Sequence, residues 1–296
     1  MADSQAGPEE TPSLAGVPWL LADMLLVTGM TVLVKIQGAS YPAVQMVFIR
    51  ALIGLVAILP LIWQRRRDFL GMRQPLRNAG RVCCNAVALT MNFVAVAALP
   101  LALVNAIGFT RPLVSMGLAA LLLSERISRT RWLGGVIAFF GVLVLISPGD
   151  LVLNAGLFAA FASVFFGSMA AVQTRALRGE STTVMMVFYT VGLVVLTLGP
   201  ALWLWQPVRP ADWVPLLAIG ILAQIAQYCF LSAYRRTEAS RLAPFSYLSI
   251  LLALGAGWAF FGERPHAGML IGGAIIIGAL HMIWRSERRR PGRGRP

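Results

Sequence analysis

The chain has 296 residues, of which 58% are hydrophobic and 12% are charged, and its formal net charge is +13. Soluble domains are about half apolar and about a quarter charged, so this composition indicates an integral membrane protein and excludes a sizeable soluble catalytic, nucleotide-binding or receptor domain. In a soluble chain the charge would suggest nucleic acid, but here the basic residues lie in short loops and at the C-terminus, so we expect no nucleic-acid partner.

Continuous apolar runs between polar residues predict ten transmembrane helices and an all-α fold, and they argue against a β-barrel. In chain order the predicted spans cover residues 19–37, 43–63, 79–98, 101–123, 132–147, 154–174, 184–205, 213–234, 242–261 and 268–284. Leu99 and Pro100 separate the third and fourth spans, since residues 79–123 are too many for one crossing. Tails at residues 1–18 and 285–296 flank the spans.

The basic residues indicate which side of the membrane each loop occupies. With a cytoplasmic N-terminus, nineteen Lys and Arg residues lie in cytoplasmic loops and the C-terminal tail, and only Arg209 and Arg264 lie on the opposite side. Because cytoplasmic loops carry the excess of Lys and Arg, we expect both termini in the cytoplasm.

Neither the cysteines nor the histidines form a recognisable site. Cys83, Cys84 and Cys229 lie in apolar segments, and His266 and His281 have no metal-ligand spacing and no partner carboxylate. No phosphate-binding loop, dinucleotide fingerprint or zinc helix motif is present. We therefore expect no cofactor, no metal and no enzymatic activity.

Each half of the chain contains a Glu-Arg pair that is followed, at the same spacing, by two glycines. The pairs are Glu125-Arg126 with Gly134-Gly135, and Glu263-Arg264 with Gly272-Gly273, at an offset of 138 residues. With five spans per half, the second copy must enter the membrane in the opposite sense. This predicts two inverted repeats, residues 19–147 and 154–284, and the glycines are also suited to close helix packing.

A proline, a small-residue apolar helix and a Glu-Arg end recur in both halves. They run from Pro112 to Ser124-Glu125-Arg126 and from Pro244 to Gly262-Glu263-Arg264, while Lys35 closes the first span and Arg50 lies in the second. On these residues the chain resembles, over 19–284, the EamA-like ten-helix group of the drug/metabolite transporter (DMT) superfamily. The resemblance implies an inner-membrane carrier for amino acids or related metabolites, often an exporter, that works by alternating access without ATP hydrolysis. Arg111 departs from it, because family members more often have a neutral residue before this proline.

Ionisable residues inside the spans predict a cationic interior. Arg50 lies about 10 Å and Arg111 about 15 Å from a span end, and a charge at such depth costs about 2.5–3.5 kcal/mol unless it faces water or a partner. Lys35 lies close enough to its span end to snorkel, and Arg81, in the first turn of its helix, is expected to reach the cytoplasmic interface. Asp23 cannot neutralise these cations, so the interior favours a ligand with a carboxylate or phosphate, and an amino acid is the simplest such ligand.

Two of these residues have alternative roles. Asp23 and Lys35 are candidate coupling residues, with a proton as the candidate coupling ion, but Asp23 equally suits a carboxylate favoured by the helix dipole. Arg111 is a candidate ligand contact, and it could equally satisfy backbone carbonyls near Gly108, because Pro112 has no N–H to donate there.

Neutral polar residues on shared helix faces complete the candidate substrate site. They are Asn85 and Asn92, Gln224, Gln227 and Tyr228, and also Tyr189 and Tyr247. Tyr189 takes about the place in the second half that Arg50 takes in the first, and Tyr247 corresponds to the Arg111 region. Polar side chains also join helices to one another, so each residue has this structural alternative.

We therefore predict a secondary active transporter that exports amino acids or related carboxylate-bearing compounds across the inner membrane. Its partners would be the small-molecule substrate and the lipid bilayer, and the chain would be a monomer or a weak oligomer. The alternative in the same class is an importer of a vitamin-like or nucleoside-like metabolite of the riboflavin or S-adenosylmethionine type. A membrane-embedded enzyme, a passive channel and a signalling subunit are further alternatives.

Overall fold

A computed structural model describes residues 15–64, 74–123, 133–137, 140–141, 144, 154–177, 180, 182–237, 242, 245, 248–263 and 267–288. These residues form helices and short turns, and none of them lies in a β-strand. The helices are α1 (Val17–Gln37), α2 (Ala43–Gln64), α3 (Pro75–Ala98), α4 (Leu101–Gly108), α5 (Arg111–Leu123), α7 (Ala155–Ala176), α8 (Thr182–Trp203), α9 (Trp213–Arg236), α11 (Leu248–Phe261) and α12 (Ala267–Arg288), and a short 3-10 helix, η2 (Pro210–Asp212), precedes α9.

Seven helical stretches among the described residues are long and apolar enough to cross a membrane, and two shorter apolar helices cover 248–261 and 267–279. The all-helical membrane architecture is therefore present. The predicted spans 132–147 and 242–261 lie partly outside the described residues, so the total of ten spans stays a prediction.

The predicted span 101–123 is not one continuous helix. α4 ends at Gly108 and α5 begins at Arg111. Pro112 cannot donate to the carbonyl of Gly108, and the chain turns at this point. Thr110 closes the turn, because its hydroxyl donates to the carbonyl of Ile107 at 2.6 Å and its own carbonyl accepts two N–H groups of α5 at 3.0 and 3.1 Å. The helix is therefore interrupted inside the predicted span, at the point where Pro112 lacks an N–H donor.

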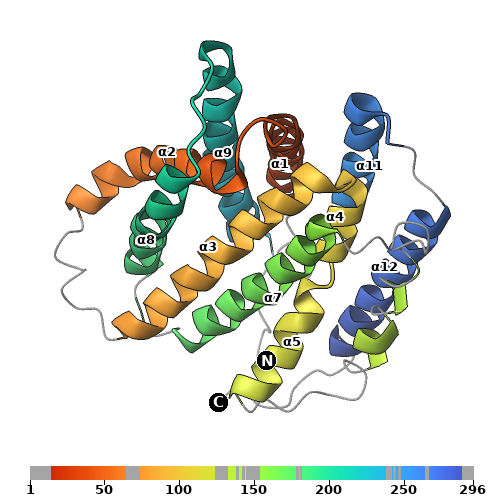
Figure 1. Cartoon of the computed structure of the whole chain (residues 1–296). Helices are drawn as coiled ribbons and strands as arrows, with labels where there is room; N and C mark the ends of the chain where they lie inside the picture. The colour runs from red at the N-terminus through yellow and green to blue at the C-terminus, as the bar shows by residue number, and fades with distance from the viewer. Residues whose placement is uncertain are drawn as a thin grey trace, which may run out of the picture.

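The two halves of the sequence are interleaved in space. α3 packs along α7, as Figure 1 shows, and α1 packs along α9, while α2 packs against α8 and α9. α5 packs against α7, and α4 packs against α11 and α12. Two groups of helices result, the α1–α9 group (α1, α2, α8 and α9) and the α3–α7 group (α3, α4, α5, α7, α11 and α12). Each group contains helices from both halves, and contacts of α3 with α1, α2 and α8 join the groups.

Glycines mark the closest approaches between helices. A Cβ atom on Gly141 would lie 3.1 Å from the carbonyl oxygen of Gly272 in α12, so Gly141 permits this close approach, whereas a Cβ on the repeat glycines Gly135 or Gly273 would meet nothing within 4 Å. Between the two groups, a Cβ on Gly192 of α8 would lie 2.7 Å from Cγ1 of Val82 in α3. Val82 is only 1% exposed, so it has no room to move away.

Gly192→Ala should therefore destabilise the protein, by about 1–3 kcal/mol, because the added methyl group overpacks the contact between α3 and α8. The matched control is Gly29→Ala in the interior of α1, where an added Cβ meets nothing within 4 Å. It should leave stability unchanged or raise it by up to about 1 kcal/mol. Thermal unfolding in detergent measures both variants, and equal midpoints would contradict this packing.

Candidate functional site

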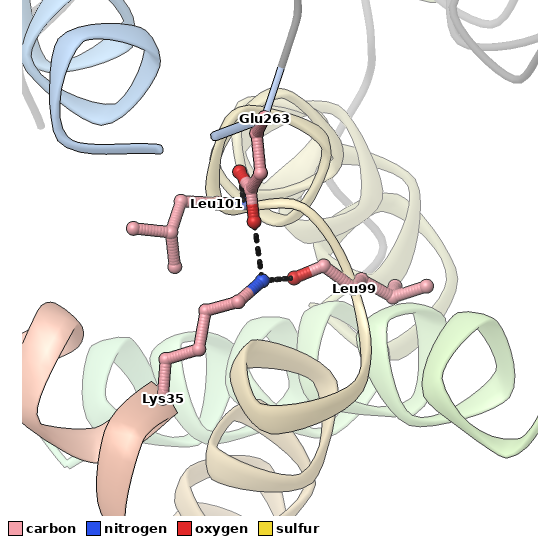
Figure 2. Close-up of polar contacts among 4 residues, drawn as sticks. All are labelled: Lys35, Leu99, Leu101 and Glu263. Atoms are coloured by element: carbon pink, nitrogen blue, oxygen red, sulfur yellow. Dashed lines mark hydrogen bonds and ion pairs between the residues drawn. The ribbon is translucent and has the colours of Figure 1, made fainter. Parts of the chain in front are cut away.

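Lys35, near the end of α1, forms an ion pair with Glu263, which follows α11. Its Nζ atom lies 2.5 Å from Oε1 of Glu263, and it donates to the carbonyl oxygen of Leu99, also at 2.5 Å. Oε2 of Glu263 accepts the N–H of Leu101 at 3.0 Å. The two charged side chains are 14% and 19% exposed, and Figure 2 shows them meeting at the connection between α3 and α4. We call these two side chains and the two backbone groups they bind the junction clamp.

The junction clamp satisfies the two helix ends that meet at Pro100. The carboxyl end of α3 presents free carbonyls with partial negative charge, and the amino end of α4 presents free N–H groups with partial positive charge. Pro100, the residue before α4, offers no side-chain cap. The ammonium of Lys35 and the carboxylate of Glu263 therefore replace the caps that the local sequence lacks.

Gly262 sets the position of Glu263. Its φ of 65° lies in the left-handed region, where glycine is favoured, and it ends α11. The N–H of Gly262 bonds to the carbonyl of Trp258 at 3.2 Å, as in the αL type of helix ending, and the N–H of Glu263 bonds to the carbonyl of Gly257 at 3.0 Å. Gly257 has no side chain to occupy the space of the Glu263 carboxylate. The chain thus reverses sharply enough to direct Glu263 toward α1.

The structure thus gives Lys35 a partner that was not predicted from the sequence, because its ammonium is held by Glu263 and a backbone carbonyl. The sequence signal for the pairing of Lys35 with Glu263 was the dipeptide Gly262-Glu263. A glycine in the left-handed conformation reverses the chain, so the side chain that follows it can point back into the helix bundle.

Arg50 lies on α2 against helices of both groups. Its Cζ atom is 6.0 Å from the centroid of the Phe93 ring of α3, and Tyr189 of α8 lies close enough to interact with it electrostatically. One turn further along α2, a Cβ on Gly54 would lie 2.6 Å from Nε2 of Gln224, so the Gln224 amide packs on the Arg50 face of α2. Arg50, Phe93, Tyr189 and Gln224 form what we call the central cluster.

The charge of Arg50 is not compensated by the described residues. Its Nη1 atom is buried and has no hydrogen-bond partner, and no described carboxylate forms an ion pair with it. The face of the Phe93 ring is a weak partner for a cation. A buried unpaired charge is strongly unfavourable, so the central cluster is suited to hold an anionic group brought by a ligand.

Arg111 lies at the break between α4 and α5, apart from the central cluster in the contacts described. A Cβ on Gly167 of α7 would lie 3.2 Å from its Nε and 3.3 Å from its Cζ, so the side chain crosses this glycine. Its carbonyl accepts the hydroxyl of Ser168 at 3.1 Å. The guanidinium forms no hydrogen bond to a described carbonyl, Gly108 included, so the ligand-contact alternative stays open.

The other candidate residues are spread over the bundle. Asn85 and Asn92 of α3 are partly buried, and Gln227 of α9 is exposed. Tyr228 is also exposed and packs edge-to-face on Trp19 of α1, with ring centroids 5.8 Å apart. Asp23 interacts electrostatically with Cys229 and Tyr234 of α9. Tyr247 lies outside the described residues.

Arg81 is buried within the bundle against α8, a contact that the sequence did not predict. It is only 7% exposed. Its Nε donates to Oδ1 of Asn78 at 3.0 Å, and its Nη2 donates to the carbonyl of Met185 in α8 at 2.8 Å. Tyr189 interacts electrostatically with Arg81 as well as with Arg50. The available signal was Asn78, which lies one helical turn before Arg81 and can hold its side chain inside.

The sequence model of the EamA-like transporter family matches residues 14–147 and 154–285. The chain is 28% identical over 266 residues to the pseudopaline exporter CntI of Pseudomonas aeruginosa, covering 88% of this chain and 92% of that protein. It is 23% identical to the S-adenosylmethionine uptake transporter of Rickettsia felis (93% and 94% covered) and 29% identical to the riboflavin transporter of Rhizobium johnstonii (80% of each). A protein of known crystal structure shares the fold with a TM-score of 0.64 at 20% identity, covering 94% of this chain and 99% of that one. The chain belongs to the EamA-like transporter family and is a multi-pass membrane transporter of small molecules.

The two charges of the junction clamp should be energetically coupled. Lys35→Met and Glu263→Gln should each lower the unfolding midpoint in detergent, because each leaves a half-buried charge without its partner. In the double variant we expect a coupling free energy of about 0.5–3 kcal/mol. The control is Lys35→Met with Asp212→Asn, since Asp212 bonds to Tyr41 instead of Lys35. That pair should be additive, and additivity in the Lys35 and Glu263 pair as well would refute the coupling.

Proposed function

We propose that this EamA-like transporter is a secondary active carrier that exports amino acids or related carboxylate-bearing metabolites across the inner membrane. The observation that carries the proposal is the buried Nη1 atom of Arg50, which has no hydrogen-bond partner among the described residues and lies where α2 meets α3 and α8. A carboxylate can accept two parallel N–H bonds from one guanidinium, so Arg50 would anchor this group. Tyr189 and Gln224 would offer further polar contacts beside it.

The position of Arg50 suits alternating access. The central cluster draws on α2, α8 and α9 of one helix group and on α3 of the other, so a substrate bound there would contact both groups. The two matches of the family model support two repeats, and the odd number of predicted spans in each would invert one relative to the other. In such a carrier the two helix groups would be the moving units, since the sequence halves are interleaved.

The alternative is an importer of a vitamin-like or nucleoside-like metabolite. The names of the relatives favour neither direction, because one is an exporter and another an uptake transporter.

Purified protein in proteoliposomes separates these possibilities. Saturable exchange of labelled for unlabelled amino acid supports the proposal, while exchange only of riboflavin or S-adenosylmethionine supports the importer. Unsaturable flux with salt-dependent conductance would indicate a channel.

Arg50→Met should separate binding from stability. Removing an uncompensated buried cation should leave the unfolding midpoint unchanged or higher. Loss of a charge-assisted contact of about 1.5–3 kcal/mol should raise the KM for exchange by about 10- to 100-fold. Arg77→Gln, on an exposed arginine of α3 that bonds to Gln74, is the matched control and should exchange normally. An Arg50→Met protein with wild-type kinetics would overturn the proposed anchor.

Arg111→Ala tests the second candidate arginine. We expect loss of carboxylate-substrate binding with the fold retained, because the guanidinium has no described hydrogen-bond partner that holds the structure together. Equilibrium binding and thermal unfolding of the same preparation measure the two effects. Unchanged uptake kinetics would remove Arg111 from the substrate site and leave Arg50 as the anchor.

A further inference from the structure

We infer that the substrate carries two acidic groups and that Arg81 binds the second of them. The inference rests on the proposed function, in which Arg50 binds the first carboxylate. It names a residue outside the candidate site of the sequence and narrows the substrate class from carboxylates to compounds with two anionic groups.

Arg50, Arg81 and Arg111 of the described spans form no ion pair with a described carboxylate, and Arg111 lies apart from the central cluster. The charge of Lys35 is neutralised by Glu263 in the junction clamp. Asp23 faces Cys229 and Tyr234 on α9 and forms no ion pair with an arginine among the described residues. Three guanidiniums thus remain without a described carboxylate, and one carboxylate from a ligand would neutralise only one of them.

The Arg81 side chain is fixed, but its charge is not compensated. Both of its acceptors, the Asn78 side-chain oxygen and the Met185 carbonyl, are neutral. They engage two of the five N–H groups of the guanidinium. The neighbouring Nδ2 group of Asn78 is also buried and lacks a hydrogen-bond partner in the described structure. The surroundings of Arg81 are therefore rich in donors and poor in anionic acceptors, as an anion-binding position requires.

α8 connects the two arginines. It packs against α2, which carries Arg50, and against α3, which carries Arg81, and Tyr189 lies one helical turn after Met185, whose carbonyl accepts Arg81. Arg50 lies about 10 Å from the first residue of α2, and Arg81 lies about 9 Å from the first residue of α3. Because these consecutive spans cross the membrane in opposite directions, the two arginines lie at different depths. One compact carboxylate would not reach both, so the second acidic group must stand several bonds from the first.

A purely structural role would have Arg81 only join α3 to α8 through the Met185 carbonyl. Asn78→Asp distinguishes the two roles. It keeps the oxygen that holds Arg81 and adds an anion beside the guanidinium. If Arg81 is structural, this change strengthens its attachment and leaves transport unaltered. If Arg81 binds substrate, the new carboxylate competes with the second acidic group of the ligand.

The experiment compares probes that differ by one acidic group. Full-length protein in proteoliposomes is tested for exchange of L-glutamate and of L-glutamine, and of succinate and succinamate. We expect the wild-type protein to prefer each diacid at least tenfold in KM. Arg81→Gln and Asn78→Asp should both reduce this preference to less than twofold without changing the KM of the monoacid, and Arg77→Gln should preserve it.

The possible failures are distinguishable. Equal KM values for diacid and monoacid in the wild type, or a preserved preference in Asn78→Asp, would overturn the inference while the proposed carboxylate transport stands. Equal loss of both substrates in Arg81→Gln together with a lower unfolding midpoint would assign Arg81 to the structural role. Absence of saturable exchange for every probe would overturn the proposed function and the inference with it.

Discussion

The shared ammonium of Lys35 is the constraint on which much of this architecture depends. Between Glu263 and the Leu99 carbonyl, it holds the end of α1, the connection of α3 to α4 and the turn after α11 in one place. α3 carries Phe93 and Arg81, and α4 leads to the break before Arg111. The direction of both helices from Pro100 determines where these residues lie. A contact on one side of the bundle therefore positions side chains deep within it.

The cations inside this helix bundle fall into two kinds, those paired with an internal carboxylate and those without one. Lys35 is fully matched by an internal carboxylate and by helix-end groups, so it contributes to structure. Arg50 contacts an aromatic face, and Arg81 is held by a side-chain amide and a backbone carbonyl, none of which carries a full negative charge. Buried cations of this kind are unfavourable for stability alone. Their presence where both helix groups meet is understandable if an anionic ligand completes the site.

The sequence predicts the apolar helices well and their partners poorly. α1, α2 and α9 start and end within a few residues of prediction, because bilayer thickness fixes the length of an apolar run. Hydropathy contains no information on which spans pack together, so it did not indicate that α1 lies along α9. Pro112 predicted a missing hydrogen bond but not the break it causes, since a neighbouring helix could have satisfied the free carbonyl.

The sequence also predicted some contacts of the candidate site and missed others. The repeat offset related Arg50 to Tyr189, and the structure brings them together with Gln224; their contact with substrate stays a prediction. The pairing of Lys35 with Glu263 depends on contacts between residues far apart in the sequence. The bond of Arg81 to the Met185 carbonyl likewise joins residues far apart in the sequence, and the place of Arg81 near a helix end gave no sign of it.

The interleaving of the halves affects how the chain can assemble during synthesis. α1 ends at Gln37, and its main packing partner, α9, begins only at Trp213. At about 5–20 residues per second, the ribosome needs roughly 10–35 s to make the intervening chain. Throughout that interval α1, with Asp23 on it, must wait in the lipid or beside an insertion factor. Biogenesis of this protein therefore ends with a late docking step, and its first half alone would lack the partners of α1, α2 and α3.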